Sequence, residues 1–428
     1  MTDPFSLPSF SFPKNFIWGS ATAGHQIEGD NFNSAWWRYE HEEHAKDPTF
    51  DLSGKACNSY VMFEEDNKIL STLHHQMYRL GIEWPRIEPN DGDFRIDEVE
   101  HYIKVFESLK EKGIKICLTL HHVSFPIWFQ DIGEFGKKEN VKYFTRFVEY
   151  VVPKIAKYVD RWIVLNEVFG GHWYNAELQQ RKINYLYSHV YARNIIKQYS
   201  NAPVSSAHAF VMQQPKRQRD KFDSVMADFR DINTNEWLFH AVRTGEVVLP
   251  FTDGFYDKEI KDSFDFWAIN TYVRNIVDCR IKNFRSDRYP FEKMKMLPRD
   301  FYLDAFNPEC IIHNISRLND RPVMITENGC SCDDDRFRIV FIAEYLSALN
   351  EVMKMGINVE GFLYWTLLDN YEWGHFFPKF GLVDVDRENG FKRTIKPSGY
   401  FLRDIIDNSG FNQDILRKYL TEIPSLKK

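Results

Sequence analysis

Short apolar segments alternate with helical segments along almost the whole chain, and this alternation constrains the fold more than any other feature. Eight segments are rich in strand-forming apolar side chains and end in turn residues. They are residues 16–20, 77–82, 114–120, 161–167, 202–208, 264–270, 323–326 and 359–365. Strand–helix alternation indicates a parallel sheet, and eight such units predict an α/β fold, a closed (β/α)8 TIM barrel.

Three of the intervening segments have helical periodicity, and they are residues 97–112, 140–155 and 337–355. In the first of them, Val99, Ile103 and Phe106 lie on one face, and Gly113 is placed to end the helix. Residues 38–57 are charged and polar, and we expect a surface loop there.

No stretch rich in Pro, Gly or Ser divides the chain, so we expect one barrel domain over residues 1–428. Residues 275–307 form a long irregular stretch, which we interpret as an elaborated loop near the site, with an ordinary surface excursion as the alternative. Hydrophobic side chains make up 43% of the chain, which is enough for a full core. The net charge of −7 provides no basic field, and this argues against nucleic acid as a partner.

No apolar run approaches the length of a membrane-spanning helix, and residues 1–15 lack the basic start and apolar core of a signal peptide. We therefore expect a cytoplasmic protein without membrane insertion, and a homo-oligomer stays an open option. The cysteines are scattered without a CxxC pair, at Cys57, Cys117, Cys279, Cys310, Cys330 and Cys332. In a cytoplasmic chain these side chains are expected to be free thiols, several of them buried.

Two of the predicted strands end in a glutamate beside an asparagine. Residues 323–326 run into Glu327 and Asn328, and residues 161–165 run into Asn166 and Glu167. One such glutamate alone is typical of a structural ion pair, whereas two could meet at one end of a sheet. In a barrel the carboxyl ends of the strands share one face, where catalytic groups collect. The polar or aromatic side chains predicted at that face are Gln26, Arg79, His122, Asn166, Glu167, Asn270, Tyr272, Glu327 and Trp365.

Two carboxyl groups without a nucleotide-binding loop indicate acid–base and nucleophilic chemistry on a neutral substrate. Cleavage of a glycosidic bond needs one protonated carboxyl group at the leaving oxygen and one carboxylate at the anomeric carbon. Arg79 would keep a nearby carboxylate ionised, and burial would keep the other carboxyl group protonated. The side chains that could bind sugar hydroxyls are Gln26, His122, Asn166 and Glu372.

We expect neither a metal nor a cofactor. His121 and His122 are followed by no second ligand at metal-binding spacing. His74 and His75 are interpreted as an exposed feature of a helix, and residues 333–335 as a solvated acidic turn without the spacing of a calcium loop.

Six ordered motifs extend over nearly the whole chain. They are residues 12–29, Arg79 with 84–87, residues 119–122 with Pro126, residues 166–167, residues 325–329, and residues 364–373 followed by 380–383. In this set the chain resembles the family-one glycoside hydrolases, the family of β-glucosidases and β-galactosidases with a (β/α)8 barrel.

The resemblance implies a retaining mechanism on a small β-glycoside. Glu327 would attack the anomeric carbon, and Glu167 would protonate the leaving group and then activate water. The two carboxyl groups would lie about 5 to 5.5 Å apart. Arg79, Asn166 and Tyr272 would support them. The residues implied in sugar binding are Gln26, His122, Asn166, Trp365, Glu372, Trp373 and Phe380.

Several positions depart from the family pattern. Val168 replaces a proline, and Val123 with Ser124 replaces a Trp-Asp pair. Glu83 stands where serine is frequent, and Lys379 where arginine is usual. None of these changes removes a catalytic group, but together they leave the substrate preference open.

Three alternatives to a β-glycosidase stay open. A 6-phospho-β-glycosidase is disfavoured because Glu372 would repel a phosphate. A transglycosidase would use the same covalent intermediate with a sugar or alcohol as acceptor. A sugar-binding barrel that has lost its chemistry would be expected to lack one of the two glutamates, and both are present.

Overall fold

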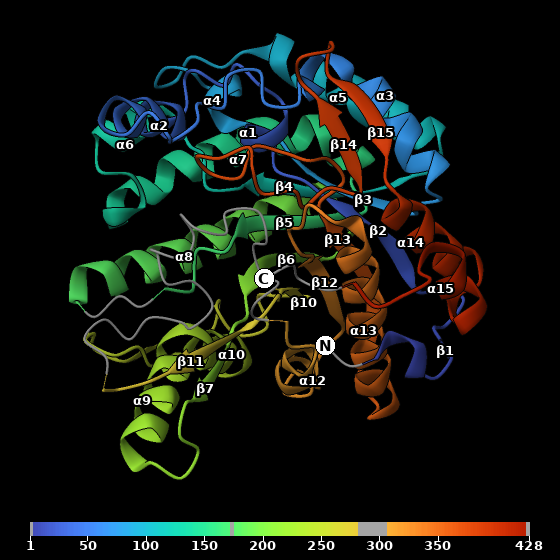
Figure 1. Ribbon diagram of the computed structural model, residues 1–428. Coiled ribbons are helices and arrows are strands. Elements are labelled where there is room, and N and C mark those ends of the chain that lie inside the picture. Colours follow the sequence, from blue (N-terminus) through green and yellow to red (C-terminus); the bar gives the residue numbers. More distant parts are fainter. Residues whose placement is uncertain (1–2, 172–174, 281–305, 425–428) are drawn as a thin grey trace.

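The computed structural model describes residues 3–171, 175–280 and 306–424, and in it eight parallel strands close into a barrel (Figure 1). The barrel strands are β2 (Ile17–Ala21), β3 (Met77–Gly81), β4 (Lys115–His121), β5 (Arg161–Asn166), β6 (Val204–Ala209), β10 (Trp267–Asn270), β12 (Val323–Asn328) and β13 (Val359–Trp365). Each strand pairs with the next in this order, and β13 pairs with β2, so the barrel has no free edge. The predicted (β/α)8 fold is confirmed, and each predicted strand boundary is met within three residues.

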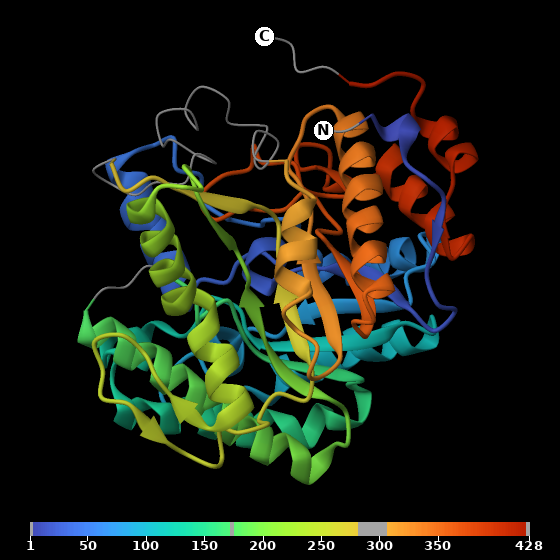
Figure 2. The same cartoon turned by 90° about the horizontal axis from the view of Figure 1, so that it is seen from below.

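Helices surround the barrel and follow its strands. They are α1 (Gly24–Ile27), α2 (Ala35–Lys46), α3 (Ser59–Thr72), α4 (Trp84–Ile87), α5 (Ile96–Glu111), α6 (Ile127–Asp131), α7 (Val141–Ile155), α8 (Ala176–Tyr199), α9 (Lys221–Asp231), α10 (Trp237–Thr244), α12 (Glu309–Ile315), α13 (Asp335–Lys354), α14 (Pro397–Asp407) and α15 (Gln413–Tyr419). Figure 2 shows α13 upright between α12 and the C-terminal helices α14 and α15. The three helices predicted from periodicity correspond to α5, α7 and α13 and are confirmed.

Within the described residues, four short two-stranded sheets lie outside the barrel. They pair β1 (Phe10–Ser11) with β16 (Gly410–Phe411), β7 (Met212–Pro215) with β11 (Arg274–Val277), β8 (Glu246–Val247) with β9 (Phe255–Tyr256), and β14 (Val383–Asp386) with β15 (Lys392–Ile395). The predicted irregular stretch 275–307 thus begins in a strand, and its residues 281–305 lie outside the described residues.

The prediction of a surface loop at residues 38–57 is wrong for its first half, because α2 extends to Lys46. The Ser34 hydroxyl caps this helix by accepting a hydrogen bond from the Trp37 amide. The charged run resembles a loop because only a narrow face of α2 is buried, and Glu40 on that face contacts His25.

Two smaller predictions also need correction. His74 and His75 follow α3 instead of lying on it: His74 is exposed in a turn, whereas His75 is buried against the Ser20 hydroxyl. The acidic turn at residues 333–335 leads directly into α13, because Asp334 caps this helix and Asp335 is its first residue.

Two glycines allow neighbouring barrel strands to approach each other closely. A Cβ atom on Gly19 would lie 1.8 Å from the Met77 carbonyl oxygen of β3. A Cβ atom on Gly329, just after β12, would lie 1.8 Å from the Trp365 carbonyl oxygen. The glycine that follows Glu327 and Asn328 is therefore required for the packing of β12 against β13.

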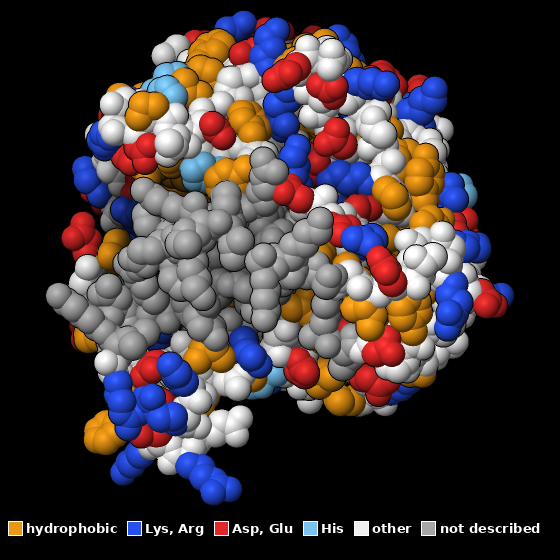
Figure 3. Space-filling model, viewed as in Figure 1, with side chains coloured by type: hydrophobic (Ala, Val, Ile, Leu, Met, Phe, Trp, Pro, Cys, Tyr) orange, Lys and Arg blue, Asp and Glu red, His pale blue; other side chains and the backbone are white. Residues whose placement is uncertain are grey.

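All six cysteines are free thiols and five are buried, as predicted. No helix within the described ranges is long and apolar enough to cross a membrane. On the face shown in Figure 3, acidic and basic side chains are interspersed over the described part, in keeping with the modest net charge.

Candidate active site

Glu327 is the penultimate residue of β12, in the mouth of the barrel, and both of its carboxylate oxygens accept hydrogen bonds. Its Oε1 accepts a hydrogen bond from Arg79 Nη1 at 2.6 Å, and its Oε2 accepts one from the Tyr272 hydroxyl at 2.7 Å. Glu327 and Arg79 are both almost fully buried. The side chains predicted to support Glu327 are therefore in contact with it, although they come from β3 and from the loop after β10.

Burial raises the pKa of the Glu327 carboxyl group, and the charge of Arg79 and the hydrogen bonds from Tyr272, Arg79 and Asn270 oppose this rise. A buried carboxylate next to an arginine is poorly hydrated but still has ionic and hydrogen-bonding partners. Such a group combines a stabilised charge with a low cost of removing water, which suits a nucleophile.

A chain of amides links Glu327 to the other strand ends. Arg79 Nη2 donates to Asn166 Oδ1 at 2.6 Å, and Asn270 Nδ2 donates to the same oxygen at 3.0 Å. Asn270 Nδ2 also donates to Glu167 Oε1 at 2.7 Å. The Thr326 hydroxyl holds Asn270 Oδ1 at 2.7 Å. Asn270 thus contacts the second glutamate directly, a contact that its position at a strand end did not reveal.

Glu167 differs from the expectation that burial keeps it protonated, because its side chain is exposed. The chain leaves β5 at Asn166, and Glu167 adopts a left-handed backbone conformation with φ of 57°. This turn places Glu167 outside the packed barrel interior, so its carboxyl group is not buried in the free protein. The separation of the Glu167 and Glu327 carboxyl groups stays a prediction.

The hydrogen bonds around His122 determine its tautomer. Arg79 can only donate, so the Asn166 oxygen faces Arg79 and the Asn166 Nδ2 faces His122 Nε2 at 3.0 Å. Burial and the charge of Arg79 lower the pKa of His122 well below its usual value, which keeps the ring neutral. His122 Nε2 therefore accepts and Nδ1 carries the proton. Within the described residues, this buried Nδ1 has no hydrogen-bond partner.

Gln26 provides a hydrogen-bond acceptor that complements the His122 Nδ1–H donor. Its Nε2 donates to the Tyr371 carbonyl oxygen at 2.9 Å and to Glu372 Oε2 at 3.0 Å. These two bonds orient the amide and leave the buried Gln26 Oε1 without a partner among the described atoms. The site thus offers one N–H donor and one C=O acceptor, which together match the hydrogen-bonding capacity of a hydroxyl group.

Glu372 follows the last barrel strand and contacts Gln26, as noted above. Burial, together with the negative charges of Glu327 and Glu167, raises the pKa of Glu372 to about 8. Three carboxyl groups are therefore close enough to influence one another electrostatically.

Aromatic rings flank His122. The His122 ring lies 5.8 Å from the Trp365 ring and 6.0 Å from the Trp373 ring, measured between centroids. Trp373 also contacts Trp36 edge-to-face at 4.7 Å. Trp36 lies in α2, just before the segment predicted as a loop, and it was not among the predicted site residues. Phe380, predicted to bind the substrate, lies almost fully buried in the barrel interior, and its contact with a ligand stays a prediction.

One group of side chains within the described ranges has metal-ligand spacing, and it comprises Asp220, Asp223 and Cys279. It lies outside the predicted site, and Arg217 and Arg280 form ion pairs with its carboxylates. This group is therefore explained by ion pairing.

Comparisons with known proteins agree with this geometry. The family model described as "Glycosyl hydrolase family 1" matches residues 9–411. The chain is 28% identical to "Beta-glucosidase A" of Acetivibrio thermocellus, with 95% of this chain and 100% of the relative covered. It is 24% identical to "6-phospho-beta-glucosidase GmuD" of Bacillus subtilis, with 94% and 99% covered. Its fold matches the solved "Family 1 b-glucosidase from Thermotoga maritima" with a TM-score of 0.83, 24% identity, and 95% and 100% of the two chains covered.

Proposed function

Because the chain belongs to glycosyl hydrolase family 1 and is an O-glycosyl hydrolase, we propose that it is a retaining, exo-acting β-glycosidase. Its substrates would be β-D-glucosides, and also β-galactosides and β-fucosides, from which it would release the terminal non-reducing sugar. The main support is Glu327, whose two oxygens are held by Arg79 and Tyr272 and which is linked through Asn270 to Glu167.

The reaction has two displacements. In the first, a Glu327 oxygen forms a bond to the anomeric carbon while the glycosidic C–O bond breaks and Glu167 gives its proton to the leaving oxygen. In the second, Glu167 takes a proton from water, and the water oxygen displaces Glu327 from the anomeric carbon. Two inversions return the sugar in its original β configuration.

Protonation of Glu167 has a different cause in this proposal from the one expected at first. Glu167 is exposed, but it lies close enough to Glu372 for its charge to raise the pKa of that residue. In the complex, a bound glycoside would cover Glu167 and remove water from its carboxyl group, which favours the protonated form.

Sugar recognition is assigned to the unpartnered polar groups. A sugar hydroxyl can donate to Gln26 Oε1 and accept from His122 Nδ1–H. Glu372 would bind further hydroxyl groups, and Trp365 and Trp373 would form the walls of the pocket. A buried donor and acceptor left unpaired cost stability, and a sugar would remove that cost.

The test is the anomer of the first product. With an aryl β-D-glucoside, proton NMR should show β-glucose first, and a 2-deoxy-2-fluoro-glucoside should label Glu327. α-Glucose as the first product would contradict the retaining mechanism. A label on another residue would contradict the role of Glu327.

The 6-phospho-β-glycosidase is the second candidate, because one relative has that name and the family alone does not exclude it. Glu372 argues against it only where it is ionised, because a carboxylate repels a phosphate, and the pKa of about 8 leaves Glu372 largely protonated near neutral pH. Comparing the plain aryl glucoside with its 6-phosphate decides between the two. Product analysis with an added sugar or alcohol acceptor decides between hydrolysis and transglycosylation, and any turnover excludes a merely sugar-binding barrel.

A further inference from the structure

Glu83 is a buried carboxylate outside the proposed catalytic machinery, and it joins three loops at the mouth of the barrel. It follows β3 and is 2% exposed. Its Oε1 accepts a hydrogen bond from the His25 amide at 3.0 Å. Its Oε2 accepts one from Asn31 Nδ2 at 2.7 Å and another from the Ser124 hydroxyl. Three donors from the loops after β2 and β4 thus share one carboxylate.

The first of these loops contains Gln26. The His25 amide that Glu83 binds belongs to the residue directly before Gln26, within the short helix α1. A Cβ atom on Gly24 would lie 2.4 Å from Glu83 Oε1, so the carboxylate packs directly against the α1 backbone. The position of the Gln26 backbone therefore depends on Glu83.

The second loop contains His122, and its backbone is strained. The Ser124 amide donates to the His122 carbonyl oxygen at 2.7 Å, which closes a three-residue γ-turn around Val123. Val123 has φ of 65°, in the left-handed region that a β-branched residue rarely adopts. A strained turn persists only where surrounding contacts hold it. The hydrogen bond from Ser124 to Glu83 is such a contact, and it lies two residues after His122.

We propose that Glu83 is a positioning residue for sugar recognition. Its carboxylate fixes the position of the Gln26 loop relative to the strained His122 turn. Gln26 Oε1 and His122 Nδ1–H can serve one sugar ring only if their loops keep a fixed relative position. This inference rests on the proposed function. In it, Glu83 aligns the donor His122 Nδ1–H with the acceptor Gln26 Oε1, so that both can bind one sugar.

The first test is Glu83→Gln, which keeps the size of the side chain but replaces one oxygen by an amide. One oxygen cannot accept from all three donors, so at least one of the three contacts is lost. We expect kcat/KM for an aryl β-glucoside to fall at least about 10-fold per active site, which corresponds to about 1.4 kcal/mol. Active sites are counted by titration with the fluoro-glucoside, so that a loss of folded protein is not mistaken for a loss of positioning.

Glu88→Gln is the matched control. Glu88 is also a fully buried glutamate in the loop after β3, and it accepts from Trp84 Nε1 and from the Gly92 amide. Its partners belong to its own loop region and to α7, through Arg146, and not to the loops of Gln26 or His122. The control should lose stability but keep kcat/KM per active site within about 3-fold. An equal loss in the two variants would overturn the inference.

A second readout does not need turnover. Amide hydrogen exchange in Glu83→Gln should accelerate about 10-fold or more in residues 24–27 and 122–125, and the change should be absent in Glu88→Gln. Unchanged exchange in both loops contradicts the proposal. If the wild-type protein cleaves no β-glycoside, the proposed function fails, and the exchange experiment still decides the role of Glu83.

The third test moves the carboxylate from position 83 to position 124, across the hydrogen bond between Glu83 and Ser124. Glu83→Ser removes it, and Ser124→Asp places a second carboxylate against Glu83, so each single variant should lose at least about 10-fold in kcat/KM. The double variant has one carboxylate again and should recover to within about 5-fold of the wild type. A double variant no better than the poorer single variant would overturn the inference. If Glu83→Ser does not fold, Ser124→Ala replaces it. An unchanged kcat/KM in Ser124→Ala would contradict the claim that the hydrogen bond from Ser124 to Glu83 positions the His122 turn.

Discussion

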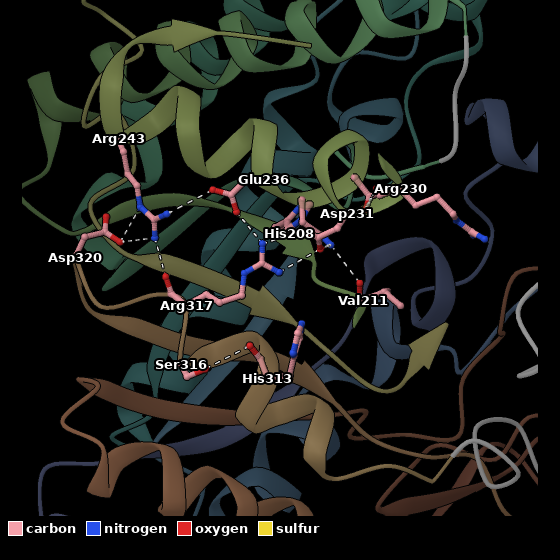
Figure 4. A network of polar contacts seen from close by, with 12 residues as sticks. His208, Val211, Arg230, Asp231, Glu236, Arg243, His313, Ser316, Arg317 and Asp320 are labelled. Atoms are coloured by element: carbon pink, nitrogen blue, oxygen red, sulfur yellow. Dashed lines mark hydrogen bonds and ion pairs between the residues drawn. The ribbon is translucent and has the colours of Figure 1, made fainter. Parts of the chain in front are cut away.

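Two networks of arginines and carboxylates in this molecule use the same side-chain chemistry in different ways. One lies in the mouth of the barrel, where Arg79 contacts Glu327 and Asn166. The other lies among the helices outside β6 and β10, where Arg317 bridges Asp231 and Glu236 (Figure 4). Arg79 is fully buried, whereas Arg317 is about a quarter exposed.

In the outer network, each of three carboxylates pairs with an arginine. Arg317 pairs with Asp231 at 2.8 Å and with Glu236 at 2.7 Å, and Arg243 pairs with Asp320 at 2.8 Å. Asp320 also accepts from the Trp267 indole N–H. Figure 4 shows Arg317 between Glu236 and Asp231, with each acid directed at a base. These ion pairs hold the helices of this region together.

The inner network is incomplete in the described structure. Gln26 Oε1 and His122 Nδ1 are buried without a partner, and the charges of Glu327 and Glu167 raise the pKa of Glu372. The comparison teaches that burial of charge alone does not mark a functional site. Unpaired polar groups beside carboxyl groups that repel one another do so, because this combination costs stability that a ligand can restore.

Glu327→Ala should produce the largest effect. Removal of the nucleophile is expected to lower kcat by at least about 10⁴-fold. The circular dichroism spectrum should be unchanged, and Glu236→Gln in the outer network serves as the control with full activity. Hydrolysis at the wild-type rate in Glu327→Ala would contradict the claim that the inner network is catalytic and the outer network only structural.

Glu167→Ala should cause the second largest loss of activity. Loss of the general acid is expected to cost about 10² to 10⁴-fold in kcat/KM for an alkyl glucoside. The loss should be smaller for a nitrophenyl glucoside, because that leaving group needs little protonation. Equal losses for both substrates would contradict the acid role of Glu167.

Glu372→Gln should change the pH dependence of stability. The pKa of Glu372 is raised in the folded protein, so ionisation of this group opposes folding as pH rises from its unfolded value near 4.5 to about 8. The variant does not titrate there, so its melting temperature relative to the wild type should be higher at pH 8.5 than at pH 4.5. Thermal unfolding at both pH values measures this, and a constant difference would show that the Glu372 pKa is unperturbed.

Arg317→Gln should have the smallest effect. Its ion pairs are partly exposed, so their loss is expected to cost about 1 kcal/mol or less in the free energy of unfolding. Urea denaturation measures this cost, and kcat/KM should stay at the wild-type value. A large loss of activity would show that the outer network reaches the site.

Features that are local in the chain could be predicted without coordinates. The eight strands follow from short apolar runs, and the strand-end positions of Glu167 and Glu327 follow from the end of each run. Arg79 was predicted beside Glu327 because parallel strands in a barrel present their carboxyl ends on one face. The helix α2 was missed because its buried face is narrow and its composition is polar.

The sequence by itself determined the barrel and which side chains meet at its mouth, because strand periodicity and strand ends are properties of neighbouring residues. Only the tertiary structure decided that Glu167 is exposed, that Gln26 is oriented by Glu372, and that Glu83 joins two loops. Gln26 and Glu372 are 346 positions apart, and the donors that Glu83 binds lie 41 to 58 positions away. Contacts of this kind form when the barrel closes, and burial then sets their protonation and their strength.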